Sequence, residues 1–141
     1  MSTPFENVFS RFERKITDYS FLEFSEEDFY NTLEDYLISA TAKIHSLSKD
    51  YSDYDLENKQ FLFELEPIEE EIIATLMVVE YLSPMLVSEE KLHNSFSTKD
   101  IRTFSPANLL GEVRELRDSY KKEADTLMMR YSYQQLDEDS F

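Results

Sequence analysis

The side chains of this sequence that are able to carry chemistry are two histidines, a run of three glutamates and one glutamate inside an apolar stretch. His45 and His93 belong to different segments, and neither has a neighbour at the spacing of metal ligands. The run Glu69–Glu71 resembles an acid cluster, but carboxylates that open a helix ordinarily complement its dipole. Glu80 lies near the end of an apolar stretch, and we expect it to be partly buried and paired with an arginine of the last helix.

No other pattern of a catalytic site is present in the sequence. The chain has no glycine-rich phosphate loop and no serine flanked by glycines. It also lacks cysteine, which excludes disulfides and thiolate metal sites and fits a reducing compartment. We therefore predict that the protein is not an enzyme, with no catalytic residue, no cofactor and no metal ion.

One segment carries a row of basic residues beside the only glycine of the chain. Arg114, Arg117 and Lys121 follow one another at helical spacing. Such rows are usually solvated and paired with nearby acids, but in an acidic protein they can also receive an acidic surface of a second copy. Gly111 lies about 200° around the helix from Val113, away from the core stripe. It is either a tolerated surface glycine, a contact with the preceding loop, or a point where another subunit approaches.

Four stretches with apolar residues at helical spacing must position these side chains. They predict helices over residues 4–16, 26 to about 47, 67 to Pro84 and 106 to about 131. Ser25 and Ser105 are expected N-caps, and Pro4, Pro67 and Pro106 stand in expected first turns. The third helix is apolar on two sides, so it should be the central and most buried one.

The remaining segments lack helical periodicity. Residues 48–65 should form a long exposed loop, in which QFLFEL alternates briefly like a strand. Residues 132–141 have no periodic apolar face, so they should form an extended tail that orders on a partner, with residues 1–131 as the helical domain. The expected core side chains are Leu33, Leu37, Ile44, Ile72, Leu76, Val79, Val113, Leu116 and Leu127.

The composition favours one small all-α domain, a bundle of about four helices. One glycine and four prolines in 141 residues leave little of the turn chemistry that tight hairpins require. The formal net charge of -16 disfavours nucleic acid as a bound ligand, although an acidic wall lets DNA pass without adhering. No apolar run approaches the ~20 residues of a membrane span and no secretory signal is visible, so we expect no membrane association and a cytoplasmic protein.

Most of residues 15–133 resembles a family of small virion proteins from tailed phages that infect Gram-positive bacteria, the head–tail connector or neck proteins. The resembling stretches are, in order, ITDYSFLEFSEEDFYNTLEDYLISATAKI, IIATLMVVEYLSPML and FSPANLLGEVRELRDSYKKEADTLMMRYSY. The most specific part is the final helix with its YSY end. These are patterns of helices rather than catalytic motifs.

The resemblance implies a structural protein of the virion neck, assembled in the host cytoplasm. Such connectors are similar in forming a ring, commonly of about twelve copies, between the portal protein and a tail or second neck protein, with DNA passing through the lumen. C-terminal segments dock on the portal, so portal-binding side chains are expected in the tail: Tyr131, Tyr133, Leu136 and Phe141. The expected subunit contacts are Gly111, Arg114, Arg117 and Lys121.

Two other classes of function remain open from the sequence. An acidic helical protein can mimic DNA and inhibit a DNA-binding enzyme, in which case it would be a monomer or dimer bound to that enzyme. It can also be a non-enzymatic assembly factor that is absent from the finished particle.

Overall fold

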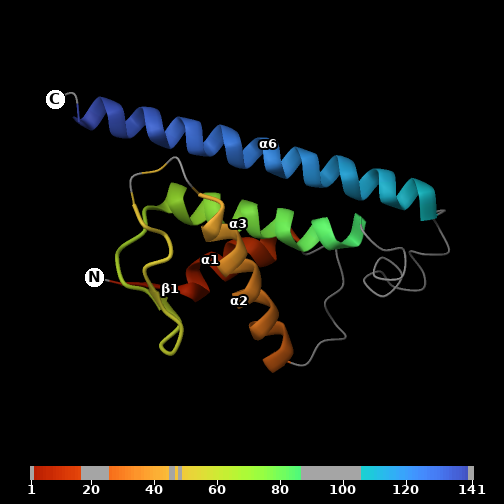
Figure 1. The fold of residues 1–141 in the computed structure, drawn as a ribbon, viewed down its shortest axis with the longest axis horizontal. Coiled ribbons are helices and arrows are strands. Elements are labelled where there is room, and N and C mark those ends of the chain that lie inside the picture. Colours follow the sequence, from red (N-terminus) through yellow and green to blue (C-terminus); the bar gives the residue numbers. More distant parts are fainter. Residues whose placement is uncertain (1, 17–25, 45–46, 48, 87–105, 140–141) are drawn as a thin grey trace.

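The computed structural model of this chain is dominated by α-helices (Figure 1) and describes residues 2–16, 26–44, 47, 49–86 and 106–139. In that part of the chain 73% of the residues are helical, which confirms the expected all-α class. The elements are, in order, β1 Thr3–Pro4, α1 Phe5–Lys15, α2 Glu26–Ala42, β2 Tyr54–Asp55, β3 Gln60–Phe61, α3 Pro67–Leu82, the 3-10 helix η1 Ser83–Leu86, and α6 Pro106–Asp139.

Helix α3 is the central element, as its two apolar sides predict. Every residue from Ile72 to Val79 is buried. Figure 1 shows α3 between α6 on one side and α1 and α2 on the other, and all three helices contact it. Pro67 stands in the first turn and Pro84 follows the last one, so both ends are where the sequence predicts them.

The loop between α2 and α3 is more ordered than predicted. Strands β1, β3 and β2 form a small antiparallel sheet in which Phe61 pairs with both Thr3 and Tyr54. Phe61 is fully buried, and its ring contacts Phe5 edge-on at 5.2 Å between centroids. The segment therefore contributes aromatic side chains to the core instead of forming a wholly exposed loop.

The core contains the predicted aliphatic residues, with two of them at its border. Leu116 and Leu127 of α6 are only partly buried, and the other seven are buried. The helix α1 adds three buried phenylalanines, Phe5, Phe9 and Phe12. Val113, Ala124 and Tyr131 mark the centre of the buried stripe of α6, and helical geometry places Leu116 and Leu127 to one side of it, which leaves both leucines partly accessible.

Two helices end elsewhere than predicted. α2 stops at Ala42 and not near residue 47, because the Thr41 hydroxyl bonds back to the Leu37 and Ile38 carbonyls and the last turn tightens. The amide of Ile44 donates to the Thr41 carbonyl, in the i→i−3 pattern of a tightened turn.

α6 begins at Pro106 as predicted, but it continues to Asp139. The expectation that residues 132–141 form an extended tail is therefore wrong for residues 132–139. No proline or glycine interrupts this stretch. The Tyr131 hydroxyl bonds to Glu66 on the body, and Gln135, one turn later in α6, donates to the same hydroxyl. Ser105, the expected N-cap, lies outside the described residues. Within the described part of the chain, no helix has the length and apolarity needed to cross a bilayer.

Candidate functional site

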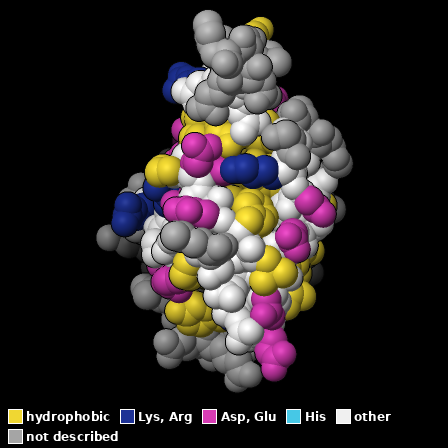
Figure 2. All heavy atoms as spheres, turned by 90° about the vertical axis from the view of Figure 1, so that its left-hand side faces the viewer, with side chains coloured by type: hydrophobic (Ala, Val, Ile, Leu, Met, Phe, Trp, Pro, Cys, Tyr) yellow, Lys and Arg dark blue, Asp and Glu magenta, His cyan; other side chains and the backbone are white. Residues whose placement is uncertain are grey.

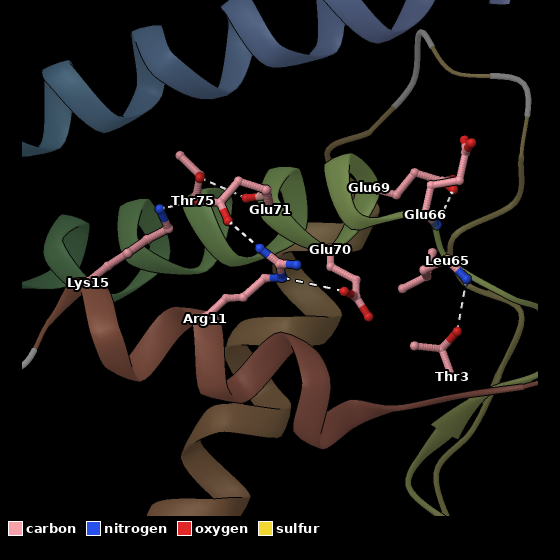
Figure 3. A network of polar contacts seen from close by, with 9 residues as sticks. All are labelled: Thr3, Arg11, Lys15, Leu65, Glu66, Glu69, Glu70, Glu71 and Thr75. Atoms are coloured by element: carbon pink, nitrogen blue, oxygen red, sulfur yellow. Dashed lines mark hydrogen bonds and ion pairs between the residues drawn. The ribbon is translucent and has the colours of Figure 1, made fainter.

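A buried carboxylate organises the start of α3. The Glu69 side chain has no exposure, and both of its oxygens are occupied. Oε1 accepts from the Lys49 ammonium at 2.8 Å and from the Glu66 backbone N–H at 2.9 Å, and Oε2 accepts from the Tyr51 hydroxyl at 2.5 Å. The bond to Glu66 caps the N-terminus of α3 (Figure 3). One side chain therefore caps this helix and also anchors the preceding loop.

Tyr131 connects this cluster to α6. Its ring is buried, and its hydroxyl donates to Glu66 Oε2 at 2.5 Å while accepting from Gln135 Nε2 at 2.9 Å. Burial raises the pKa of Tyr131 above its ordinary value, and the hydrogen bond to Glu66 raises it further. Burial and the bond to Glu69 raise the pKa of Tyr51 in the same way. Both hydroxyls therefore remain neutral donors at physiological pH.

The other two glutamates of the run bind the first helix. Arg11 contacts Glu70 at 3.4 Å and Glu71 at 2.9 Å, and Lys15 also pairs with Glu71 (Figure 3). Burial alone would raise the pKa of Glu71, but the hydrogen bonds and charges of Lys15 and Arg11 outweigh it and lower the pKa. The run complements the helix start as predicted, and it also holds α1 and the loop, which the sequence did not indicate.

The polar groups of this cluster bond to one another, so the cluster serves to hold the fold together. No buried side-chain nitrogen or oxygen of the described residues lacks a hydrogen-bond partner. Across the described ranges, no group of three or more His, Cys, Asp or Glu side chains is placed to hold a metal ion. His45 and His93 lie outside those ranges, so the predictions about these two histidines remain predictions.

Glu80 is partly buried, as expected, but its partner is not an arginine of the last helix. Lys43, just after the end of α2, makes the ion pair with it. The arginines of α6 are directed elsewhere, because Arg114 is exposed and Arg117 contacts its neighbour Asp118 at 2.9 Å.

α6 carries an outer face, the exposed side of this helix that is turned away from α3. Its exposed side chains include Arg114, Glu115, Asp118, Lys121, Lys122, Met129, Arg130 and Tyr133. Met129 is 60% exposed and Tyr133 is 63% exposed, one helical turn apart. Met129 and Tyr133 are the large apolar side chains that the described part of this face exposes, and nothing in the sequence pattern indicated the exposure of Met129.

Gly111 belongs to the same outward side. Apart from its chain neighbours and the nearby backbone of α6 itself, no atom of the described residues lies within 4 Å of the position that a Cβ atom would take there. Arg114 and Lys121 form no ion pair with any residue of the described chain, whereas Arg117 does. The four predicted subunit-contact residues thus lie on one helix. The contacts within the described chain do not explain why position 111 is a glycine.

The predicted portal-binding residues have different environments. Tyr131 is only 2% exposed and is used inside the chain, so it belongs to the core. Tyr133 is exposed and available to a partner. Leu136 lies on the last turns of α6, but its side chain and the whole of Phe141 fall outside the described part.

Comparison with protein-family models, curated proteins and solved structures gives no match for this chain. Its function must therefore be inferred from its own residues and geometry.

Proposed function

We propose that this chain is a structural, non-enzymatic protein of the phage neck, which forms a ring between the portal and the tail and extends the DNA channel. One observation carries the proposal. α6 is 34 residues long, and over residues 111–135, where its side chains are described, it buries one side against the body and exposes the other. A helix face of this kind suits packing against other chains.

The composition of the outer face supports assembly. It combines exposed Met129 and Tyr133 with cations that have no partner among the described residues. Methionine and tyrosine supply large contact area and are enriched at interfaces. Gly111 lies on this helix although glycine costs about 1 kcal/mol in a helix interior, and close approach of a neighbouring copy would account for it.

The net charge of the chain supports the proposal that the ring lines a channel through which DNA moves. Thirty acidic and 14 basic residues leave a net charge of -16, which repels phosphates. Figure 2 shows acidic side chains spread over the end of the molecule that it faces, including its lower half, where they lie beside hydrophobic ones. In the proposed ring, many of these acids line the lumen.

The C-terminal turns of α6 are the proposed contact with the portal. Figure 1 shows them extending past the start of α3, away from the body. Since residues 132–139 are helical, the proposed docking is that of a helix end that presents Tyr133. An extended strand does not fit this geometry.

The test is reconstitution with the portal protein of the same phage, followed by electron microscopy and sedimentation. We expect a ring of this chain on the portal, with α6 at the contacts between copies. A monomer or dimer that ignores the portal and instead binds a nuclease or repressor would identify a DNA mimic. Absence from mature particles would identify an assembly factor.

A further inference from the structure

A pocket lies where the starts of α1 and α2 meet the strand hairpin. Its volume is about 270 Å³, and Phe5, Phe9 and Tyr30 are its aromatic walls. The rings of Phe9 and Tyr30 are 6.4 Å apart between centroids, and Tyr30 is 43% exposed. The pocket therefore offers aromatic surface to something that enters from solvent.

The polar groups of the pocket are mainly acceptors. Glu6 and Glu34 line it together with Lys59 and Asn31, and the Lys59 ammonium is already paired with Glu34. Glu6 receives only the Tyr30 hydroxyl, at 3.5 Å, and pairs with no lysine or arginine of the described chain. One carboxylate without a cation beside aromatic rings favours a positively charged guest over an anion.

The backbone around the pocket is held in an unusual conformation. Lys59 has a positive φ of 56°, which is uncommon for a residue other than glycine. Its carbonyl accepts the first amide of α1, from Phe5, at 2.9 Å. The hydrogen bond from Phe5 and the ion pair with Glu34 fix Lys59 beside the pocket. The pocket is therefore preformed.

The chain itself has exposed cationic side chains that could enter such a pocket, but they lie on α6, away from it. Arg114, Lys121, Lys122 and Arg130 of α6 are exposed and form no ion pair with the described residues. Tyr120 of α6 reaches the end of α1 at the Lys15 carbonyl. The pocket lies at the starts of α1 and α2, and in Figure 1 α3 lies between α6 and these two helices, so the pocket is turned away from the α6 cations of its own copy. A closed head-to-tail ring needs two different surfaces that match each other on every copy.

We infer that the pocket binds an arginine from α6 of the neighbouring copy, and that this arginine is Arg114. The inference rests on the proposed function and specifies the contact that closes the ring. Arginine fits because its apolar stem packs on aromatic rings while its guanidinium donates to a carboxylate. Arg114 is one turn from Gly111, where the missing side chain lets the neighbour come close.

Charge exchange tests this contact in the full-length protein assembled on the portal. Glu6→Arg and Arg114→Glu should each reduce the assembled fraction about tenfold, because each leaves two like charges in contact. The double variant restores the pair in reverse, so its assembled fraction should return close to that of the unmodified protein. Glu64→Arg, an exposed residue outside the pocket, is the matched control and should assemble normally.

The outcomes separate the contact from the function. Rings that form normally with Glu6→Arg and with Arg114→Glu would overturn the inference and leave the proposed function in place. Two weakened single variants without recovery in the double variant would overturn the direct pairing. If the unmodified protein forms no ring, both fail. Circular dichroism checks the folding of each variant. Tyr30→Ala removes an aromatic wall of the pocket and should also weaken assembly. It replaces Glu6→Arg as the test of the pocket if that variant does not fold.

Discussion

Glu69 shows how a single charged side chain is kept inside this protein. A buried ion costs several kcal/mol unless it is paired and hydrogen-bonded, and Glu69 has Lys49, Tyr51 and a backbone amide as partners. The neighbouring pair of Tyr131 and Glu66 extends this arrangement to α6. The run Glu69–Glu71, which resembles an acid cluster in the sequence, thus binds α1 and the loop to the start of α3, and Glu66 binds α6 to the same place.

At this scale, Tyr131→Phe should destabilise the folded domain by about 1–2 kcal/mol. The ring still fills its site, but Glu66 Oε2 and Gln135 lose the hydroxyl that they share. Urea unfolding followed by circular dichroism measures the effect. Tyr133→Phe is the control, because Tyr133 is exposed, and it should leave the midpoint unchanged. Equal midpoints for both variants would show that the Tyr131 hydroxyl contributes nothing to stability.

Gly111→Ala should stabilise the isolated domain by about 1 kcal/mol, since alanine is the better helix former. Outside the nearby backbone of α6 and its chain neighbours, the new methyl group meets no described atom within 4 Å. Thermal unfolding of the two proteins gives the difference. A lower melting temperature for the alanine variant would contradict the open surroundings of this position. The larger variant Gly111→Leu should keep the helicity of the isolated domain and prevent ring formation on the portal.

The ion pairs of Glu71 should make stability depend on pH. Its pKa is lowered in the folded state, so its contribution is present above the unfolded pKa of about 4.3 and is lost as the pH falls through the folded value. Denaturation at a series of pH values between about 6 and 3 measures this. Glu71→Gln should show a smaller loss over that range, and the exposed Glu64→Gln should behave like the unmodified protein. Identical pH profiles for all three would refute the assignment.

At the scale of elements, α6 divides into an inner stripe and an outer face. The inner stripe is marked by buried Val113, Ala124 and Tyr131, at spacings that keep them on one side of the helix. After Tyr131, the side chains of Tyr133 and Gln134 are exposed, and Gln135 donates to the Tyr131 hydroxyl of the same helix. Among the described side chains of α6, Tyr131 is thus the last one that is buried against the body.

Removing residues 132–141 should leave a folded domain and abolish attachment to the portal. The truncated protein keeps Tyr131 and its bond to Glu66, although the Tyr131 hydroxyl loses the hydrogen bond from Gln135. Circular dichroism of the truncated protein and its co-sedimentation with portal particles measure both effects. Attachment at the level of the full chain would exclude the C-terminal turns as the docking element.

At the scale of the whole molecule, the net charge of -16 should govern assembly. Copies repel one another through solvent, and the range of this repulsion falls to about 8 Å at 0.15 M salt. Ring formation should therefore increase when salt is raised from about 0.02 M to about 0.15 M, as measured by sedimentation. A steady decrease over the same range would mean that attraction at the contacts, not overall repulsion, dominates.

The sequence by itself determined the elements that depend on local signals. Helix starts at Pro67 and Pro106, the buried nature of α3 and the helical class follow from capping residues and from apolar spacing. The placement of Gly111 and Arg114 on an outward side of α6 was also predictable, since helical geometry alone sets it.

Only the tertiary structure decided which distant groups meet. The partner of Glu80, the burial of Glu69, the pocket around Glu6 and the internal use of Tyr131 all depend on how α1, the loop and α6 pack around α3. The end of α6 is a further example. Residues 132–139 have no periodic apolar face, yet they continue the helix to Asp139 after the hydrogen bond between Gln135 and Tyr131. Local patterns carry no information about such contacts, because their energies arise between residues far apart in the chain.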